Sequence, residues 1–221
     1  MLNRTAISSG AYLESFDSLP KEILWTQAQI DQSLAETMSR RPDQRELWVF
    51  AYGSLMWNPI SEYDKRIVAT LDDWHRSFCI RLIAGRGSPE RPGRMLSLEP
   101  GGRTEGIALR IPEATLNDEL RILWIREMVT GAYTPTWAPV SFRSGGYATA
   151  LVFVANPEQA QFEPDAHPQT IAPLIAEAFG SFGTNAEYVF KLQRSLADCE
   201  MRDRYIDELA VELVRLGQSP A

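Results

Sequence analysis

Residues 48–59 read WVFAYGSLMWNP, and this stretch decides how the chain folds. Its first five residues are all apolar or aromatic, as is typical of a short strand buried on both faces. The strand pattern ends at Gly53-Ser54, and a bulky apolar pair and a turn follow. A strand that ends at such a small pair leaves backbone N–H groups outside any ladder, where they can hold a carboxylate or a phosphate. We therefore expect a buried strand over 48–52 followed by an anion-binding loop.

The composition is that of a soluble globular protein of ordinary size. The chain has 221 residues, of which 44% are hydrophobic and 23% charged, so a single domain with a sizeable core is expected. The net charge of −7 argues against general nucleic-acid binding, which requires a basic surface. The acidic residues are spread along the chain, which indicates solubility rather than a cationic partner. We therefore expect no nucleic-acid partner; the sequence leaves the oligomeric state open, with a monomer favoured.

Nothing in the sequence indicates export or membrane insertion. Residues 1–17 lack a basic region followed by an apolar stretch, so no secretory signal is expected. No apolar run approaches the roughly 18 residues that a membrane helix needs. Cys79 and Cys199 lie in different elements and in no paired motif, which predicts two reduced thiols. The expected location is the reducing cytoplasm.

The periodicity predicts an α+β fold in which a β-rich middle is flanked by helices. Residues 1–17 look irregular, Ser18-Leu19-Pro20 starts a helix, and residues 40–44 form a polar linker. That first helix carries apolar residues on one face, namely Ile23, Ile30, Leu34 and Met38. Later helices are expected at about 113–129, 169–179, 185–199 and 202–216, with a capping box formed by Thr184 and Glu187.

The strands are predicted to be six or seven in number and mostly connected by hairpins. Turn signals lie at Asp72-Asp73, at Pro100-Gly101-Gly102 and at Ser144-Gly145-Gly146. A longer Gly- and Pro-rich loop is expected at 85–93, either as a plain flexible loop or as a lid over a site. The strands themselves are expected at 48–52, 65–71, 76–83, 94–99, 104–111, 137–143 and 147–155.

The sequence contains few of the usual catalytic or cofactor-binding motifs. Ser54 is not in a GxSxG elbow, and only His75 and His167 could serve as its base, so a Ser-His-Asp hydrolase is disfavoured. Two histidines and two cysteines without close spacing form no usual zinc site, and no metal is predicted. Gly85-Arg86-Gly87 lacks the third glycine and the following helix of a dinucleotide fingerprint. No cofactor is therefore expected.

Glu127 is the strongest candidate for proton transfer. On the helix expected at 113–129, Leu116, Leu120 and Leu123 share one face, and at about 100° per residue Glu127 falls within the same apolar arc. Burial would raise the pKa of this carboxyl toward neutrality, as a general acid/base requires. The alternative is that Glu127 ends the helix and turns to solvent, or pairs with an arginine.

Other side chains could line a pocket, although core packing is the better explanation for each aromatic residue and a surface position for each arginine. The aromatic candidates are Tyr52, Trp57, Tyr133, Trp137 and Tyr188. The candidate carboxylate clamps are Arg76, Arg81 and Arg143.

Several spaced motifs together resemble the ChaC-type γ-glutamylcyclotransferases. They are the opening stretch 48–59, WHRSFC at 74–79, PERPGR at 89–94, LEPGG at 98–102, LWIREM at 123–128, GAYTPTW at 131–137 and RDRY at 202–205. The resemblance covers roughly 46–216, which suggests a domain over 46–216 preceded by an N-terminal extension, 1–45, with one helix. One departure is Asn185, which stands where the family often has Cys in a Gly-x-Cys-x-x-Tyr stretch.

The resemblance implies a small, mostly antiparallel β-barrel with flanking helices. It also implies a lyase that cleaves glutathione to 5-oxoproline and cysteinylglycine without a cofactor. Glu127 matches the family's catalytic glutamate, and Tyr52–Leu55 match the loop that holds the γ-glutamyl group. The residues expected to bind substrate are Ala51, Tyr52, Gly53, Ser54, Leu55, Met56, Tyr133 and Tyr188.

The expected chemistry suits this set of residues, because the substrate's own α-amine attacks its γ-carbonyl and no protein nucleophile is needed. A single carboxylate can relay the proton from one nitrogen to the other. Two alternatives remain open: a cyclotransferase for other γ-glutamyl amino acids or γ-glutamylamines, and a non-catalytic module that binds a γ-glutamyl ligand.

Overall fold

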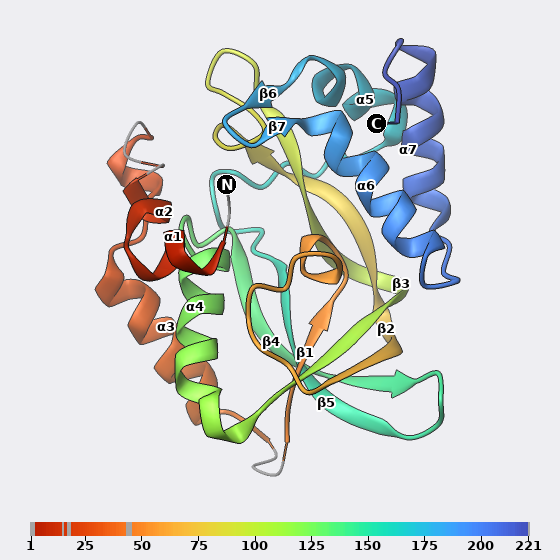
Figure 1. Ribbon diagram of the computed structural model, residues 1–221. Coiled ribbons are helices and arrows are strands. Elements are labelled where there is room, and N and C mark those ends of the chain that lie inside the picture. Colours follow the sequence, from red (N-terminus) through yellow and green to blue (C-terminus); the bar gives the residue numbers. More distant parts are fainter. Residues whose placement is uncertain (1–2, 15, 17–18, 43–45, 221) are drawn as a thin grey trace.

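The centre of the molecule is a closed barrel of five strands with helices on two sides (Figure 1). The computed structural model describes residues 3–14, 16, 19–42 and 46–220. The barrel strands are β1 (Leu47–Ala51), β2 (Lys65–Leu82), β3 (Gly93–Ile111), β4 (Tyr133–Phe142) and β5 (Tyr147–Ala155). A separate two-stranded sheet is formed by β6 (Phe179–Gly180) and β7 (Gly183–Thr184).

The barrel is mostly antiparallel, as predicted. Its strand order is β1-β3-β2-β4-β5, and a short parallel pairing of β1 with β5 closes it, with Trp48 opposite Ala150. All five residues of β1 are buried, which explains the continuous apolar run that opened the sequence analysis. The α+β class, the barrel and the flanking helices are thus confirmed.

Two of the expected turns are wrong, because each lies inside one long, bent strand. The segments 65–71 and 76–83 belong to β2, and the segments 94–99 and 104–111 belong to β3. The two strands pair along their length, and the register shifts where Asp72 faces Arg103 and Trp74 faces Pro100. Asp73 and the Gly101-Gly102 pair, all at positive φ, lie opposite each other there. They form an irregular bend in the ladder instead of two hairpins.

The helices gather in two groups on opposite sides of the barrel (Figure 1). The first group is α1 (Arg4–Ser8), α2 (Ala11–Glu14), α3 (Gln27–Ser39) and α4 (Leu116–Glu127). The second is α5 (Pro168–Glu177), α6 (Asn185–Ala197) and α7 (Arg204–Arg215). Single 3₁₀ turns lie at η1 (Lys21–Ile23), η2 (Ser54–Met56) and η3 (Glu113–Thr115). No helix in the described ranges is long and apolar enough to cross a membrane.

The N-terminal region is more ordered than the sequence predicts. The described part of 1–17, expected to be irregular, contains α1 and α2, whose Ile7 and Tyr12 pack against Ile122 and Ile125 of α4. Helices this short are stabilised by such packing rather than by their own propensity, so no periodicity reveals them.

The first predicted helix starts later than expected. Ser18 lies outside the described residues, and Pro20 precedes only the short turn η1. The helix α3 begins after Thr26, whose side chain forms a reciprocal capping box with Gln29. Ile30 is buried in the core, whereas Ile23 lies in η1, outside the helix. Part of the linker expected at 40–44 also lies outside the described residues.

The later helices and the second hairpin agree with the predictions to within a few residues. The capping box of Thr184 and Glu187 is present at the start of α6. The helix expected at 113–129 opens with η3 and ends at Glu127, two residues early.

Asn185 joins α6 to the start of β3. Its side chain is 1% exposed, and its Oδ1 accepts from the Arg94 N–H at 2.8 Å while its Nδ2 donates to the Arg94 carbonyl at 3.0 Å. The amide thus pairs with one backbone unit as a neighbouring strand would. Asn185 therefore has a structural role at the position where the resembling family often has Cys.

Replacing Asn185 by Ala is expected to destabilise the fold by about 2–4 kcal/mol, because two buried backbone groups lose their partners. Asn156→Ala is the matched control, since its side chain makes longer and more exposed bonds at 3.5 and 3.2 Å. The control should cost less than about 1 kcal/mol. Urea unfolding measures both, and equal losses would contradict this role for Asn185.

Candidate active site

The loop after β1 leaves two backbone donors unused. Met56 N–H bonds to the Gly53 carbonyl at 2.9 Å, and Ser54 N–H donates to the Tyr188 hydroxyl at 3.2 Å. In the described part of the chain, the N–H groups of Gly53 and Leu55 donate no hydrogen bond. A Cβ on Gly53 would lie 2.8 Å from the Tyr188 hydroxyl, so glycine is needed for this close approach. The loop can therefore offer N–H groups to an anionic ligand.

Glu127, the last residue of α4, is held at low exposure. Its side chain is 14% exposed, and its Oε1 lies 2.9 Å from Nε of Arg126, although without the alignment of a hydrogen bond. Burial raises the pKa of the Glu127 carboxyl above its usual value, and the positive charge of Arg126 opposes part of that rise. A raised pKa makes this carboxyl a stronger base than an ordinary, exposed glutamate, which suits a group that must accept a proton and later release it.

Arg126 connects Glu127 to the loop. Besides facing Glu127, its guanidinium donates through Nη2 to Ser54 Oγ at 2.7 Å and through Nη1 to the Asn58 carbonyl. The residue is 6% exposed, so its charge is little screened by water. One rigid guanidinium therefore fixes where the carboxylate lies relative to the loop.

Three buried tyrosines lie close enough to Glu127 for its charge to act on their hydroxyls. Burial raises the pKa of the Tyr52, Tyr133 and Tyr188 hydroxyls, for Tyr188 to about 12, and the negative charge of Glu127 adds to the rise in all three. Tyr52 donates to the Phe153 carbonyl at 2.5 Å, and Tyr133 donates to the Leu96 carbonyl at 2.9 Å. These two hydroxyls are thus engaged within the barrel wall, whereas Tyr188 accepts from the loop.

The structure brings together most of the residues expected to form the site. Glu127 acts through its charge on Tyr52, Tyr133 and Tyr188, and the loop residue Ser54 is linked to Arg126 and to Tyr188. The side chains of Ala51, Leu55 and Met56 are buried in the core. Trp57 packs edge-on against Tyr188 at 5.3 Å between ring centroids, whereas Trp137 donates to the Thr37 carbonyl at 3.0 Å.

The arginines considered as carboxylate clamps do not face this site. Arg81 and Arg143 are partly exposed and pair with Glu163 and Glu105 at the surface. Arg76 is buried and lies behind the loop, where its Nε donates to the Tyr52 carbonyl at 2.8 Å.

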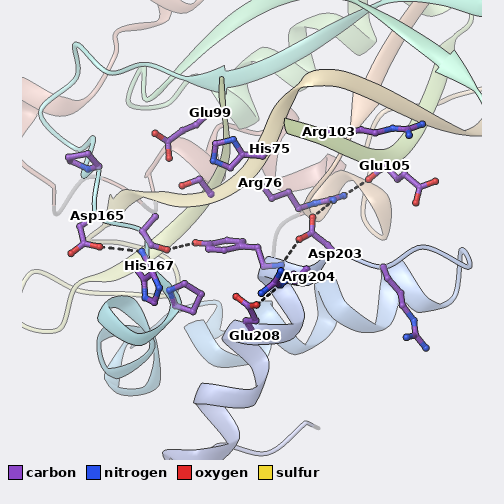
Figure 2. A pocket seen from close by; sticks show the side chains of 16 residues that line it. His75, Arg76, Glu99, Arg103, Glu105, Asp165, His167, Asp203, Arg204 and Glu208 are labelled. Atoms are coloured by element: carbon purple, nitrogen blue, oxygen red, sulfur yellow. Dashed lines mark hydrogen bonds and ion pairs between the residues drawn. The ribbon is translucent and has the colours of Figure 1, made fainter. Parts of the chain in front are cut away.

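A cavity of about 980 Å³ lies on that far side of Arg76, between the bend of the barrel and the start of α7 (Figure 2). It includes neither Glu127 nor the loop residues 52–56. His75 and His167 both line it, and neither contacts Ser54, whose hydroxyl accepts from Arg126. Ser54 therefore has no base. In the described residues, no group of three or more His, Cys, Asp or Glu side chains is placed to hold a metal ion.

The sequence analysis missed Tyr12. Its hydroxyl donates to the Arg126 carbonyl at 3.2 Å, and burial followed by the charge of Glu127 raises its pKa. Tyr12 lies in the N-terminal segment, where the sequence shows no regular spacing of apolar residues. The only local hint is the apolar pair Ile7 and Tyr12, which pack together on α4.

Two buried carboxyls on α4 should have pKa values shifted in opposite directions from the ordinary value. The Glu127 pKa should lie above the usual range. Burial alone would raise the Glu119 pKa too, but hydrogen bonds from Arg4 and the Glu62 N–H lower it. Carboxyl ¹³C NMR, with each signal assigned by Glu→Gln substitution, measures both values. A Glu127 pKa at or below that of Glu119 would contradict the electrostatics described here.

Comparison with known proteins places the chain in a family. The family model described as ChaC-like protein matches residues 47–216. The glutathione-specific gamma-glutamylcyclotransferase of Escherichia coli K12 is 44% identical over 216 residues, which cover 98% of this chain and 94% of that protein. Glutathione-specific gamma-glutamylcyclotransferase 1 of Mus musculus is 30% identical, covering 76% of this chain and 78% of that protein.

A solved structure extends the agreement to the fold. The crystal structure of the gamma-glutamyl cyclotransferase specific to glutathione from yeast superimposes with a TM-score of 0.71 at 23% identity, covering 77% of this chain and 96% of that one. The resemblance stated from the motifs is thus confirmed. Because the family model matches most of the chain and the E. coli protein is similar over nearly all of it, this chain belongs to the ChaC-like protein family.

Proposed function

We propose that the protein is a glutathione-specific γ-glutamylcyclotransferase, a lyase that converts glutathione to 5-oxoproline and cysteinylglycine. The relatives' activity supports this proposal, as does the family membership. The single observation that carries it is the buried Glu127 carboxylate, tied through Arg126 to a loop with unused N–H groups. That pair supplies a proton carrier and an anion grip, which is what this reaction needs from a protein.

In the proposed mechanism, the substrate folds so that its α-amine reaches its own γ-carbonyl carbon. Glu127 takes a proton from the α-ammonium, and the freed amine attacks, forming the C–N bond of the five-membered lactam. The attacking nitrogen then loses its second proton and the amide bond to cysteine breaks, so that the leaving nitrogen receives the proton held by Glu127 and, with the second proton, ends as the ammonium group of cysteinylglycine. No water is consumed, and the carboxylate is regenerated.

The loop and Tyr188 hold the substrate in this folded shape. The N–H groups of Gly53 and Leu55 would bind either the α-carboxylate or the oxyanion that forms on the γ-carbonyl. Tyr188, which accepts from Ser54 rather than donating to a carbonyl, is placed to hydrogen-bond the substrate. Because the bound substrate has already lost the conformational entropy needed to bring its reacting groups together, that loss no longer adds to the barrier of the chemical step.

Residues 46–216 form the catalytic domain in this proposal, and the N-terminal extension packs beside it. We also propose that the protein works as a cytoplasmic monomer with a small-molecule substrate and no nucleic-acid partner. The two free cysteines, Cys79 and Cys199, are consistent with a reducing compartment.

The wild-type protein should release 5-oxoproline and cysteinylglycine from glutathione in equal amounts, measured by mass spectrometry. Glu127→Gln should lower kcat by about 10³-fold or more, because the amide cannot carry the proton. Glu113→Gln is the matched control, since Glu113 is exposed near the other end of the same helix. If Glu127→Gln retained turnover, Glu127 could not be the catalytic acid/base.

Substrate choice is tested separately with a panel of γ-glutamyl compounds at equal concentration. The proposal expects kcat/KM to be highest for glutathione and lower for γ-glutamyl amino acids and γ-glutamylamines. Faster turnover of a compound that lacks the cysteinylglycine part would overturn glutathione specificity while leaving the reaction type intact. Binding of all of them without any product would instead identify a non-catalytic module.

A further inference from the structure

Each of the three guanidinium nitrogens of Arg76 donates a hydrogen bond behind the loop. Its side chain is 1% exposed; its Nε donates to the Tyr52 carbonyl at 2.8 Å and its Nη1 to Asp203 Oδ2 at 2.8 Å. Its Nη2 donates to the Glu105 carbonyl at 2.6 Å. Figure 2 shows the side chain extended toward Asp203 at the inner wall of the cavity. Because each of its three nitrogens has a partner, the guanidinium is held in place, and so is the Tyr52 carbonyl that it contacts.

The group that it holds belongs to the same peptide unit as the Gly53 N–H. The chain described here has no cis peptide bond, so the Tyr52 carbonyl and the Gly53 N–H point in opposite directions across one planar amide. With the carbonyl aimed at Arg76 and the cavity, the N–H is aimed away from both. It is one of the two loop N–H groups that have no partner among the described residues.

A positive charge on a carbonyl also strengthens the N–H of that peptide as a donor. Hydrogen bonds in series polarise one another, and the effect is larger where water is excluded. A charged donor on Tyr52 O therefore does more than a backbone donor would. The Asp203 carboxylate is itself anchored at the start of α7, where it accepts from Tyr205 N–H and Ile206 N–H at 3.0 and 3.3 Å.

We propose that Arg76 is a positioning residue of the active site, which aims the Gly53 N–H and strengthens it as a donor to the γ-glutamyl group. The inference rests on the proposed function for the identity of the ligand. It extends that function by giving the arginine of the WHRSFC motif a role that requires no contact with the substrate.

A buried arginine–carboxylate pair elsewhere in the barrel provides a matched control. Arg94 is 6% exposed, and its Nη2 donates to Glu163 at 2.6 Å. Its guanidinium makes no hydrogen bond to the loop among the described contacts. Arg76→Lys and Arg94→Lys therefore both remove a buried guanidinium and keep a positive charge, but only the first releases the Tyr52 carbonyl.

The kinetic test compares the two variants in the glutathione assay. Arg76→Lys is expected to lower kcat/KM by about 10-fold or more, and Arg76→Met to lower it further, because Lys restores part of the charge. Arg94→Lys should stay within about 2-fold of wild type. A loss mainly in KM means that the N–H grips the α-carboxylate, and a loss mainly in kcat means that it grips the oxyanion; both support the proposal. Equal losses in the two Lys variants would overturn it.

A second readout works without turnover and in variants of different stability. The ¹H–¹⁵N signal of the Gly53 amide is expected to move in Arg76→Lys and in Asp203→Asn, which keeps the N-cap acceptor, but not in Arg94→Lys. An unmoved Gly53 signal in Arg76→Lys would refute the positioning role. If the wild type makes no 5-oxoproline, the proposed function fails, and this signal still decides whether Arg76 controls the Gly53 amide.

Discussion

The contacts of the Arg126 guanidinium are the ones on which the proposed site depends, because they join the carboxylate to the loop that, in the proposed function, binds the same substrate. The guanidinium faces Glu127 at 2.9 Å and donates to Ser54 Oγ at 2.7 Å. Burial raises the Glu127 pKa, and the adjacent positive charge of Arg126 opposes part of that rise. Loss of this contact would change both the pKa and the position of the carboxylate.

The rest of the molecule holds the ends of this arrangement. The bent barrel brings Arg76 against the back of the loop, and the N-terminal helices cover the end of α4, where Tyr12 bonds to the Arg126 carbonyl. Trp25 also covers this end of α4. Its backbone N–H donates to the Val129 carbonyl, and its indole ring would lie only 2.2 Å from a Cβ on Gly131. The N-terminal segment therefore forms part of the wall around Glu127, although the family model begins only at residue 47.

The sequence predicted the features that depend on local pattern. The strand at 48–52, the capping box of Thr184 with Glu187, and a carboxylate in the apolar arc of one helix all follow from spacing within a few residues. The continuity of β2 and β3 could not be predicted in this way. The same residue types signal a hairpin turn and an irregular bend, and only the pairing of β2 with β3 along their length distinguishes the two. The partners of Arg76 and Tyr12 were hidden for the same reason, since each contact joins segments far apart in the chain.

The central claim is that Glu127 carries the proton and that Arg126 sets its pKa. The most direct measurement is the pH dependence of kcat/KM for glutathione in the wild type and in Arg126→Met. A base must be ionised, so activity should rise with pH through the raised pKa of Glu127. Removing the positive charge should move this acid limb to higher pH, because a neighbouring cation lowers a carboxyl pKa. An acid limb that stays in place in Arg126→Met, or that persists in Glu127→Gln, would contradict the account.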